Sequence, residues 1–248
     1  FFHPAMEAEP LIFVEVALVK GLADNVHALL DQKAPVLDPT QADTAIFYSI
    51  SNCQRGLSGI SFGNFLIKQV VDRLSGEFRN LKTFATLSPI PGFRRWIDEK
   101  LAAGDRLLGE DENEALAEAL AAHGEAAVAE TPPLARLLAR RGWHRDAALA
   151  DVARPVLTRL CARYLLAESD GRGRARDPVA HFHLTNGARV ERLNWLADTS
   201  EKGIKESAGL MVNYLYDRDA IETNHEAYVG EGRRAASTAM KRLARGWV

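Results

Sequence analysis

The chain has 248 residues, of which 47% are hydrophobic, enough for a sizeable core in one large domain or two small ones. Its 31 basic and 33 acidic residues give a net charge of −2, so no overall basic excess points to nucleic acid. No apolar run approaches the roughly 18 residues that a membrane span needs, so we expect no membrane-spanning helix. Cys53 and Cys161 lie far apart, which argues against a zinc ribbon or a disulfide scaffold and favours a reducing compartment.

The N-terminus, residues 1–4, has no initiator methionine and no signal-peptide pattern. We therefore expect a fragment or a processed form, with sequence missing upstream. A cytoplasmic location is expected, although a missing targeting segment leaves mitochondria or peroxisomes open. The C-terminal residues 245–248 lack the peroxisomal Ser-Lys-Leu signal.

The first third of the chain predicts strands and helices in alternation. Strands are predicted at 11–19, 44–50 and 81–87 from their apolar runs. One short helix is predicted to begin at Asp24 or Asn25 and to run to about Leu30, and a second one covers 64–78, where apolar residues recur at helical spacing. This alternation favours a three-layer α/β architecture.

The middle of the chain, from Phe93 to Leu166, is rich in Ala, Leu, Arg and Glu and predicts helices. Five breaks divide it into about four helices: Gly104, Gly124, Pro132-Pro133, Gly142 and Pro155. We interpret about 94–168 as a helical insertion within an α/β domain.

The last part predicts mixed structure again. Residues 179–184 and 188–195 are predicted to form a hairpin around Thr185-Asn186-Gly187, because Asn-Gly is a strong hairpin signal. A strand is predicted at 211–216 and a closing amphipathic helix at 232–245.

The turn between Ile50 and Asn64 is the first candidate site. A strand that passes through a glycine-containing turn into a helix presents free backbone N–H groups, which suit a pyrophosphate. The spacing matches neither Gly-x-Gly-x-x-Gly nor a P-loop, because Lys68 lacks the adjacent glycine and hydroxyl residue. From the residues alone, a plain turn remains the better interpretation.

Two further candidates carry reactive side chains. Ser88 ends a predicted strand before Pro89-Ile90-Pro91-Gly92, at the kind of strand end where α/β sheets bind ligands. From the residues alone, a simple turn cap is the better interpretation, because Ser is common before Pro. His181 and His183 would face the same side of a strand, but no third ligand has the spacing to complete a metal site. One histidine can instead act as a proton donor. From the residues alone, a hydrogen-bonded structural histidine is the better interpretation.

Several of these segments together resemble the malonyl-CoA decarboxylase family. The matching segments are residues 1–4, 45–51, 56–59, 63–68, 87–93, 182–184, 186–188, 194–198, 207–216 and 224–226. They occur in the family's order and cover nearly the whole chain apart from the helical middle.

The resemblance implies a GNAT acetyltransferase-like fold, a mixed sheet flanked by helices, for a catalytic domain that covers residues 1–248. It implies conversion of malonyl-CoA to acetyl-CoA and CO2 without an organic cofactor or a metal. The family's N-terminal helical domain, which helps to assemble a homo-oligomer, is expected to be absent from this chain.

The resemblance also implies roles for individual residues. The family's catalytic serine and histidine correspond to Ser88 and His183, and a pocket tyrosine corresponds to Tyr216. The CoA-binding turn corresponds to a run of seven residues: Ser58, Gly59, Ile60, Ser61, Phe62, Gly63 and Asn64.

This turn departs from related patterns in two places. Some relatives have a glutamate at the position of Ser61, and Gly56 and Gly59 stand one residue further apart than in the acetyltransferase turn. The pyrophosphate contacts therefore need not match those of the acetyltransferases.

Two other functions remain open on the same scaffold. One is an acyl-CoA-dependent N-acyltransferase, which needs a base beside an amine site. The other is an acyl-CoA sensor without turnover, against which the presence of both Ser88 and His183 argues.

Overall fold

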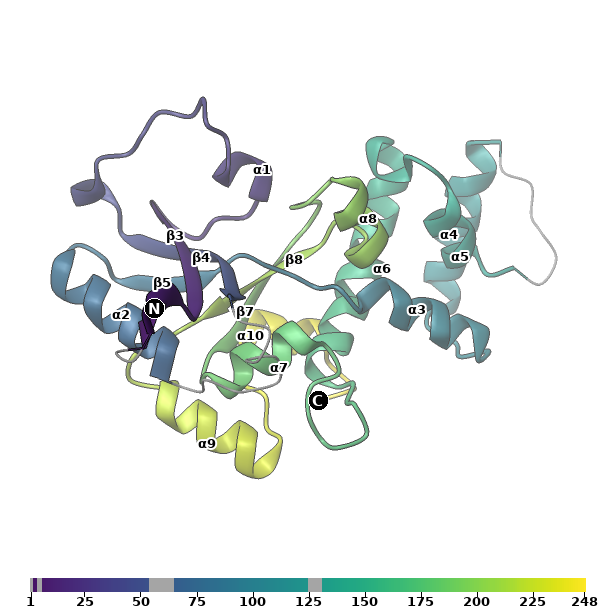
Figure 1. Ribbon diagram of the computed structural model, residues 1–248. Helices are drawn as coiled ribbons and strands as arrows, with labels where there is room; N and C mark the ends of the chain where they lie inside the picture. Colours follow the sequence, from purple (N-terminus) through teal and green to yellow (C-terminus); the bar gives the residue numbers. More distant parts are fainter. Residues whose placement is uncertain (1, 4–5, 54–64, 125–130) are drawn as a thin grey trace. The chain divides into compact units, whose positions relative to one another are not determined.

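The computed structural model describes residues 2–3, 6–53, 65–124 and 131–248 (Figure 1). The chain divides into two compact units. The first comprises Phe1–Ser88, His181–Asn194 and Val212–Ser237, and the second comprises Pro89–Ala180, Trp195–Met211 and Thr238–Val248.

The first unit is built on a mixed sheet of six strands in the order β3-β4-β5-β8-β6, with β7 paired to β8. The strands are β3 (Ile12–Val19), β4 (Thr44–Asn52), β5 (Thr83–Thr86), β6 (Ser88–Pro89), β7 (Arg189–Asn194) and β8 (Met211–Leu215). β3 and β4 are antiparallel, β4 and β5 are parallel, and β5 and β8 are antiparallel. The predicted α/β class, a mixed sheet flanked by helices, is confirmed.

The remaining elements of this unit are short except for two helices. They are β1 (Phe2–His3), β2 (Met6–Pro10), α1 (Val26–Leu29), the 3-10 turn η1 (Pro39–Gln41), α2 (Phe65–Glu77) and α9 (Ile221–Glu231). Asn25 caps α1, as predicted, by accepting a hydrogen bond from the backbone N–H of Ala28.

Burial explains why β4 and α2 form where they do. Ala45, Ile46 and Phe47 are consecutive and all buried, as expected for a strand that is covered on both faces. Parallel strands need a crossover connection, and α2 lies between β4 and β5 in the chain. Its residues Ile67 and Val71 are one helical turn apart and fully buried.

The second unit is helical and confirms the predicted helical middle. It contains α3 (Phe93–Ala102), α4 (Glu110–Ala122), α5 (Pro133–Ala139), η3 (Trp143–Arg145), α6 (Ala147–Leu166), α8 (Glu201–Ser207) and α10 (Thr238–Leu243). Its largest buried side chains are Trp96, Trp143 and Tyr164.

Two predicted helix boundaries are wrong. Pro155 does not break the helix but lies inside α6, where a loss of about 3 kcal/mol is outweighed by the burial of eleven side chains along its length. The closing helix does not span 232–245, because Gly232 has a φ of 68° and ends α9, and α10 begins only at Thr238.

The predicted hairpin around Asn186-Gly187 is also wrong, because residues 178–185 form the helix α7 (Pro178–Thr185). Asp177 caps its start and accepts hydrogen bonds from the N–H groups of Val179 and Ala180, at 3.0 and 2.9 Å. Pro178, whose N–H is missing, occupies the first helical position, where no partner is needed.

The same Asn-Gly pair ends this helix. Gly187 has a φ of 77°, the left-handed conformation that favours glycine. The N–H of Ala188 donates to the carbonyl of His183, and the N–H of Gly187 donates to the carbonyl of Leu184, both at 3.0 Å. This pair of bonds defines a Schellman motif, so the signal that favoured a hairpin is here a helix end.

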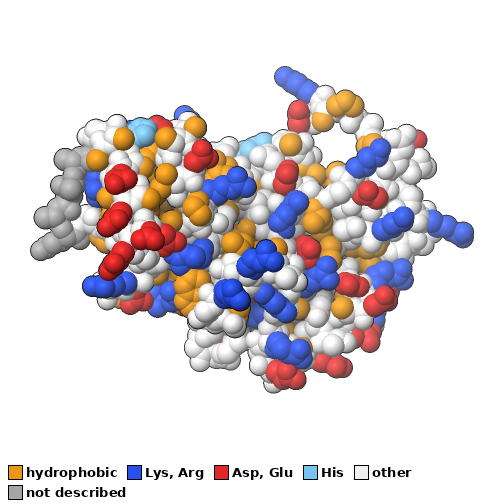
Figure 2. All heavy atoms as spheres, turned by 180° about the vertical axis from the view of Figure 1, so that it is seen from behind, with side chains coloured by type: hydrophobic (Ala, Val, Ile, Leu, Met, Phe, Trp, Pro, Cys, Tyr) orange, Lys and Arg blue, Asp and Glu red, His pale blue; other side chains and the backbone are white. Residues whose placement is uncertain are grey.

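Charges of both signs are mixed on the surface. Figure 2 shows Lys and Arg side chains interspersed with Asp and Glu side chains on the face seen from behind, which agrees with the small net charge. Over the described part of the chain, no helix combines the length and apolar character that a membrane span requires.

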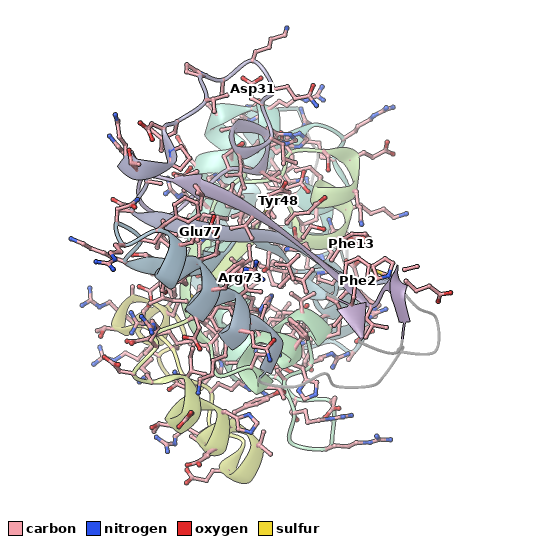
Figure 3. All side chains as sticks on the ribbon, turned by 60° about the vertical axis from the view of Figure 1, so that its left-hand side comes forward. Phe2, Phe13, Asp31, Tyr48, Arg73 and Glu77 are labelled. Carbon is pink, nitrogen blue, oxygen red and sulfur yellow. The ribbon has the colours of Figure 1, made fainter. Side chains whose placement is uncertain are left out.

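One apolar groove is open on the first unit. Phe2 and Phe13 are exposed and line it together with Val70, Arg73 and Glu77 of α2 (Figure 3). None of the described residues that line this groove was predicted to be catalytic.

Candidate functional site

The structure brings the three predicted catalytic side chains together within the first unit. Ser88 Oγ lies 3.1 Å from Nε2 of His183, although 95 positions separate the two residues in the chain. Nδ1 of the same ring lies 2.7 Å from the hydroxyl of Tyr216. The exposed fractions of Ser88, His183 and Tyr216 are 5%, 3% and 2%, so burial holds all three in place.

Three elements supply these side chains. Ser88 begins the two-residue strand β6, which pairs in the sheet, whereas the sequence predicted that Ser88 ends a strand before the two prolines. Tyr216 directly follows β8, and its N–H donates to the carbonyl of Phe84 at 2.8 Å. His183 lies on α7, not on a strand as predicted.

Two residues that the sequence analysis missed complete the cluster. The hydroxyl oxygens of Ser88 and Thr86 are 2.8 Å apart, and Thr86 Oγ1 also accepts a hydrogen bond from the N–H of Tyr214 at 3.1 Å. The ring of Tyr214 stacks on the ring of His183, with centroids 4.4 Å apart and an interplanar angle of 25°. Thr86 ends β5 and Tyr214 lies on β8, so both join the cluster through the pairing of these two strands, for which neither strand alone carries a sequence signal.

Burial controls the charge state of the cluster. It lowers the pKa of His183 to about 3 and raises the pKa of Tyr216 above its usual value of 10. At neutral pH the free protein therefore holds an uncharged imidazole, in which one nitrogen donates a hydrogen bond and the other accepts one.

The hydrogen bonds favour one tautomer of this ring. Among the residues that the structure describes, the hydroxyl of Tyr216 has one hydrogen-bond partner, Nδ1 of His183. An unpaired buried hydroxyl proton is costly, so Tyr216 donates to Nδ1. Nε2 then carries the ring proton, and this N–H donates a hydrogen bond to Ser88 Oγ.

His181 does not share the site of His183. Its Nδ1 lies 2.8 Å from the hydroxyl of Tyr228, a residue of α9. The expected pair on one strand face is wrong because residues 181 and 183 are helical, and positions two apart on a helix point in different directions. Within the described ranges, no three His, Cys, Asp or Glu side chains gather as a metal site would require.

A cavity of about 530 Å³ lies beside the cluster in the first unit. Tyr216 contributes to its lining, together with Lys68, Asp72, Lys82 and Arg218. Its charges are partly paired: Lys68 Nζ lies 2.5 Å from a carboxylate oxygen of Glu222, and Arg218 Nη2 lies 3.5 Å from Asp72. The predicted CoA-binding residues, Ser58 to Asn64, lie outside the described residues.

Comparisons with known proteins point to one family. The model of the malonyl-CoA decarboxylase C-terminal domain matches residues 1–247. The chain is 39% identical over 234 residues to the mitochondrial malonyl-CoA decarboxylase of Anser anser anser and 38% identical over 241 residues to that of Rattus norvegicus. These alignments cover 93% and 96% of this chain but 46% and 48% of the relatives, so the chain spans about half of their length.

Solved structures agree with the sequence relatives. A crystal structure of malonyl-CoA decarboxylase from Rhodopseudomonas palustris superposes with a TM-score of 0.86 at 45% identity and covers 98% of this chain and 51% of that one. One from Agrobacterium vitis gives a TM-score of 0.81 at 45% identity, with 98% and 55% covered.

Proposed function

Because the chain belongs to the malonyl-CoA decarboxylase C-terminal domain family, we propose that it converts malonyl-CoA to acetyl-CoA and CO2 as the catalytic domain of a longer enzyme. The observation that carries this proposal is the hydrogen-bonded chain Ser88–His183–Tyr216. It supplies a hydrogen-bond donor, a proton carrier and a second hydroxyl in one buried place.

The reaction itself explains why so few groups are enough. Cleavage of the bond between Cα and the carboxyl carbon leaves an electron pair on Cα, and the thioester delocalises it as an enolate. CO2 leaves as a neutral molecule, and one proton forms the new C–H bond, so each turnover consumes one proton. The thioester is the electron sink, so this chemistry does not demand an organic cofactor.

The enzyme then has three tasks. It must hold the carboxylate so that the breaking bond overlaps the carbonyl π system. It must offer hydrogen bonds to the developing enolate oxygen, and it must deliver a proton to Cα. In our assignment His183 supplies the proton, directly or through the hydroxyl of Ser88. Ser88 also binds the malonyl carboxylate or the thioester oxygen, and Tyr216 holds the imidazole.

Burial has a consequence for the order of events. The low pKa of His183, about 3, means that the free protein does not store the reactive proton on its imidazole at neutral pH. A bound malonyl carboxylate places a negative charge beside the ring, which favours the imidazolium and raises its pKa. Substrate binding and protonation of His183 are therefore coupled in this proposal.

We assign CoA binding to residues 58–64, which directly precede α2 in the chain. Backbone N–H groups of Ser58 to Asn64 would hold the pyrophosphate at the positive end of α2. Replacement of Gly59 by a bulky residue should then weaken CoA binding.

One assay separates this function from its alternatives. The purified chain is incubated with malonyl-CoA, and CO2 and acetyl-CoA are measured together; decarboxylation gives both in equal amounts. Release of free CoA that depends on an added amine, without CO2, would indicate an N-acyltransferase. Saturable binding without any product would indicate a sensor. Either of these results would contradict the proposal.

Assembly and location stay predictions. We expect the full-length protein to be a homo-oligomer in the cytoplasm, whereas the names of the goose and rat relatives place those proteins in mitochondria.

A further inference from the structure

Thr86 is buried completely and lies beside Ser88 at the centre of the first unit. Its backbone and side chain are both fixed. The carbonyl of Thr86 accepts a hydrogen bond from Nδ2 of Asn213 at 2.7 Å, and its Oγ1 accepts one from the N–H of Tyr214 at 3.1 Å. Thr86 Oγ1 is thus held by strand β8 at 2.8 Å from Ser88 Oγ.

The proton of Ser88 has a limited choice of acceptors. Nε2 of His183 carries a proton in the tautomer favoured by Tyr216, and it also carries one in the imidazolium form. In both states Ser88 Oγ accepts from His183, so the proton of Ser88 must point elsewhere. Among the described residues, the acceptor within hydrogen-bond distance is Thr86 Oγ1.

Substrate binding changes this arrangement. When a carboxylate or thioester oxygen of the substrate accepts the hydrogen bond from the Ser88 hydroxyl, Ser88 no longer donates to Thr86. The hydroxyl of Thr86 can then rotate and donate its own proton to Ser88 Oγ, because a hydroxyl both donates and accepts. The two oxygens stay hydrogen-bonded at the same distance, while the direction of the bond reverses.

We infer that Thr86 is a positioning residue for the decarboxylation, and that its hydroxyl reverses its hydrogen bond with Ser88 so that the Ser88 proton is free to meet the substrate. This role rests on the proposed function. With donors from His183 and Thr86 on both sides, the Ser88 oxygen keeps one rotamer and carries less negative charge, which makes its proton a stronger hydrogen-bond donor.

Replacement of Thr86 by valine tests this role, because valine keeps the shape and removes the hydroxyl. We expect kcat for CO2 release to fall about 10- to 100-fold with little change in KM, since the lost interaction is used mainly in the transition state. Thr86→Ser should recover kcat to within about threefold of the parent, which is under 1 kcal/mol. Thr44→Val is the matched control. Thr44 is also a buried strand threonine of the first unit, but its hydroxyl donates a hydrogen bond to the Asp43 carboxylate.

A double-mutant cycle distinguishes positioning from a general structural role. If Thr86 acts through Ser88, Thr86→Val should have almost no further effect on kcat in a Ser88→Ala background. Full additivity of the two losses would overturn the inference, and so would a Thr86→Val enzyme as active as Thr44→Val. If the parent chain itself releases no CO2, the proposed function fails and the role of Thr86 fails with it. If the parent chain releases CO2 and Thr86→Val releases it at the parent rate, the proposed function stands and only the inference about Thr86 is wrong.

Discussion

Each of the two units buries a polar cluster, and the two clusters differ in what surrounds the titratable group. In the first unit, His183 contacts the hydroxyls of Ser88 and Tyr216, which can rotate and exchange protons. In the second unit, Asp177 accepts hydrogen bonds from the backbone N–H groups of Val179 and Ala180. These N–H groups are fixed by the backbone and do not exchange protons with the carboxylate.

The pKa values show the same contrast. Burial alone lowers the pKa of His183. Burial raises the pKa of Asp177, while the N–H groups of Ala180, Gly92 and Val179 and the hydroxyl of Tyr164 lower it. A shifted pKa therefore does not by itself mark a reactive group. The partners of His183 are hydroxyls, which can give and take protons and so favour chemistry there. Asp177 has one hydroxyl partner, Tyr164, but most of its partners are backbone N–H groups, which favours a structural helix cap.

The largest expected effect comes from His183→Asn. Asparagine keeps a hydrogen-bonding group but cannot act as an acid, so kcat for CO2 release should fall about 10²- to 10⁴-fold. His181→Asn, on the same helix but bonded to Tyr228, is the control and should stay near the parent rate. Melting temperatures should match among the variants. A folded His183→Asn enzyme within about threefold of the parent would mean that another group is the acid.

Asp177→Ala should mainly affect stability. It removes the cap of α7 and leaves buried N–H groups without an acceptor, so we expect the free energy of unfolding to fall by about 2–3 kcal/mol, measured by urea denaturation. Asp151→Ala, on the exposed side of α6, should change it by less than about 0.5 kcal/mol. The contrast between the clusters breaks down if Asp177→Ala keeps its stability but loses as much kcat as His183→Asn.

The two clusters should also differ in how stability depends on pH. The folded-state pKa of His183 lies below its unfolded value, so its contribution is present above pH 6.5 and is lost as the pH falls toward about 3. The folded-state pKa of Asp177 is raised above 3.8, so its contribution is present at low pH and is lost as the pH rises through the raised value.

Urea denaturation at several pH values between 4 and 7 measures how the free energy of unfolding depends on pH in each variant. One group contributes at most about 1.4 kcal/mol per pH unit. When the pH falls from 7 to 4, the free energy of unfolding of His183→Asn should therefore drop less than that of the parent. That of Asp177→Asn should drop more than that of the parent. If both variants shift the pH dependence in the same direction, the assigned environments of these two groups are wrong.

Local sequence determined most of the first unit. The apolar runs at 11–19 and 44–50 and the helical spacing over 64–78 predicted β3, β4 and α2, because these patterns match burial on a sheet and on one helix face. The resemblance of the ordered motifs to the malonyl-CoA decarboxylase family, and not any local pattern, indicated Ser88, His183 and Tyr216. The roles of these residues stay proposals.

The tertiary structure decided what these local patterns left open. Residues 178–185 are apolar enough for a strand or a helix, and the Asn-Gly pair fits a hairpin turn or a helix end. The Asp177 cap and the close approach of Gly187 to the backbone of Ile221 accompany the helix, and a Cβ at Gly187 would lie 2.1 Å from the Ile221 carbonyl oxygen. Thr86 and Tyr214 join the site only because β5 and β8 are neighbours in the sheet. A contact across the sheet depends on strand order and register, which no local pattern in one strand encodes.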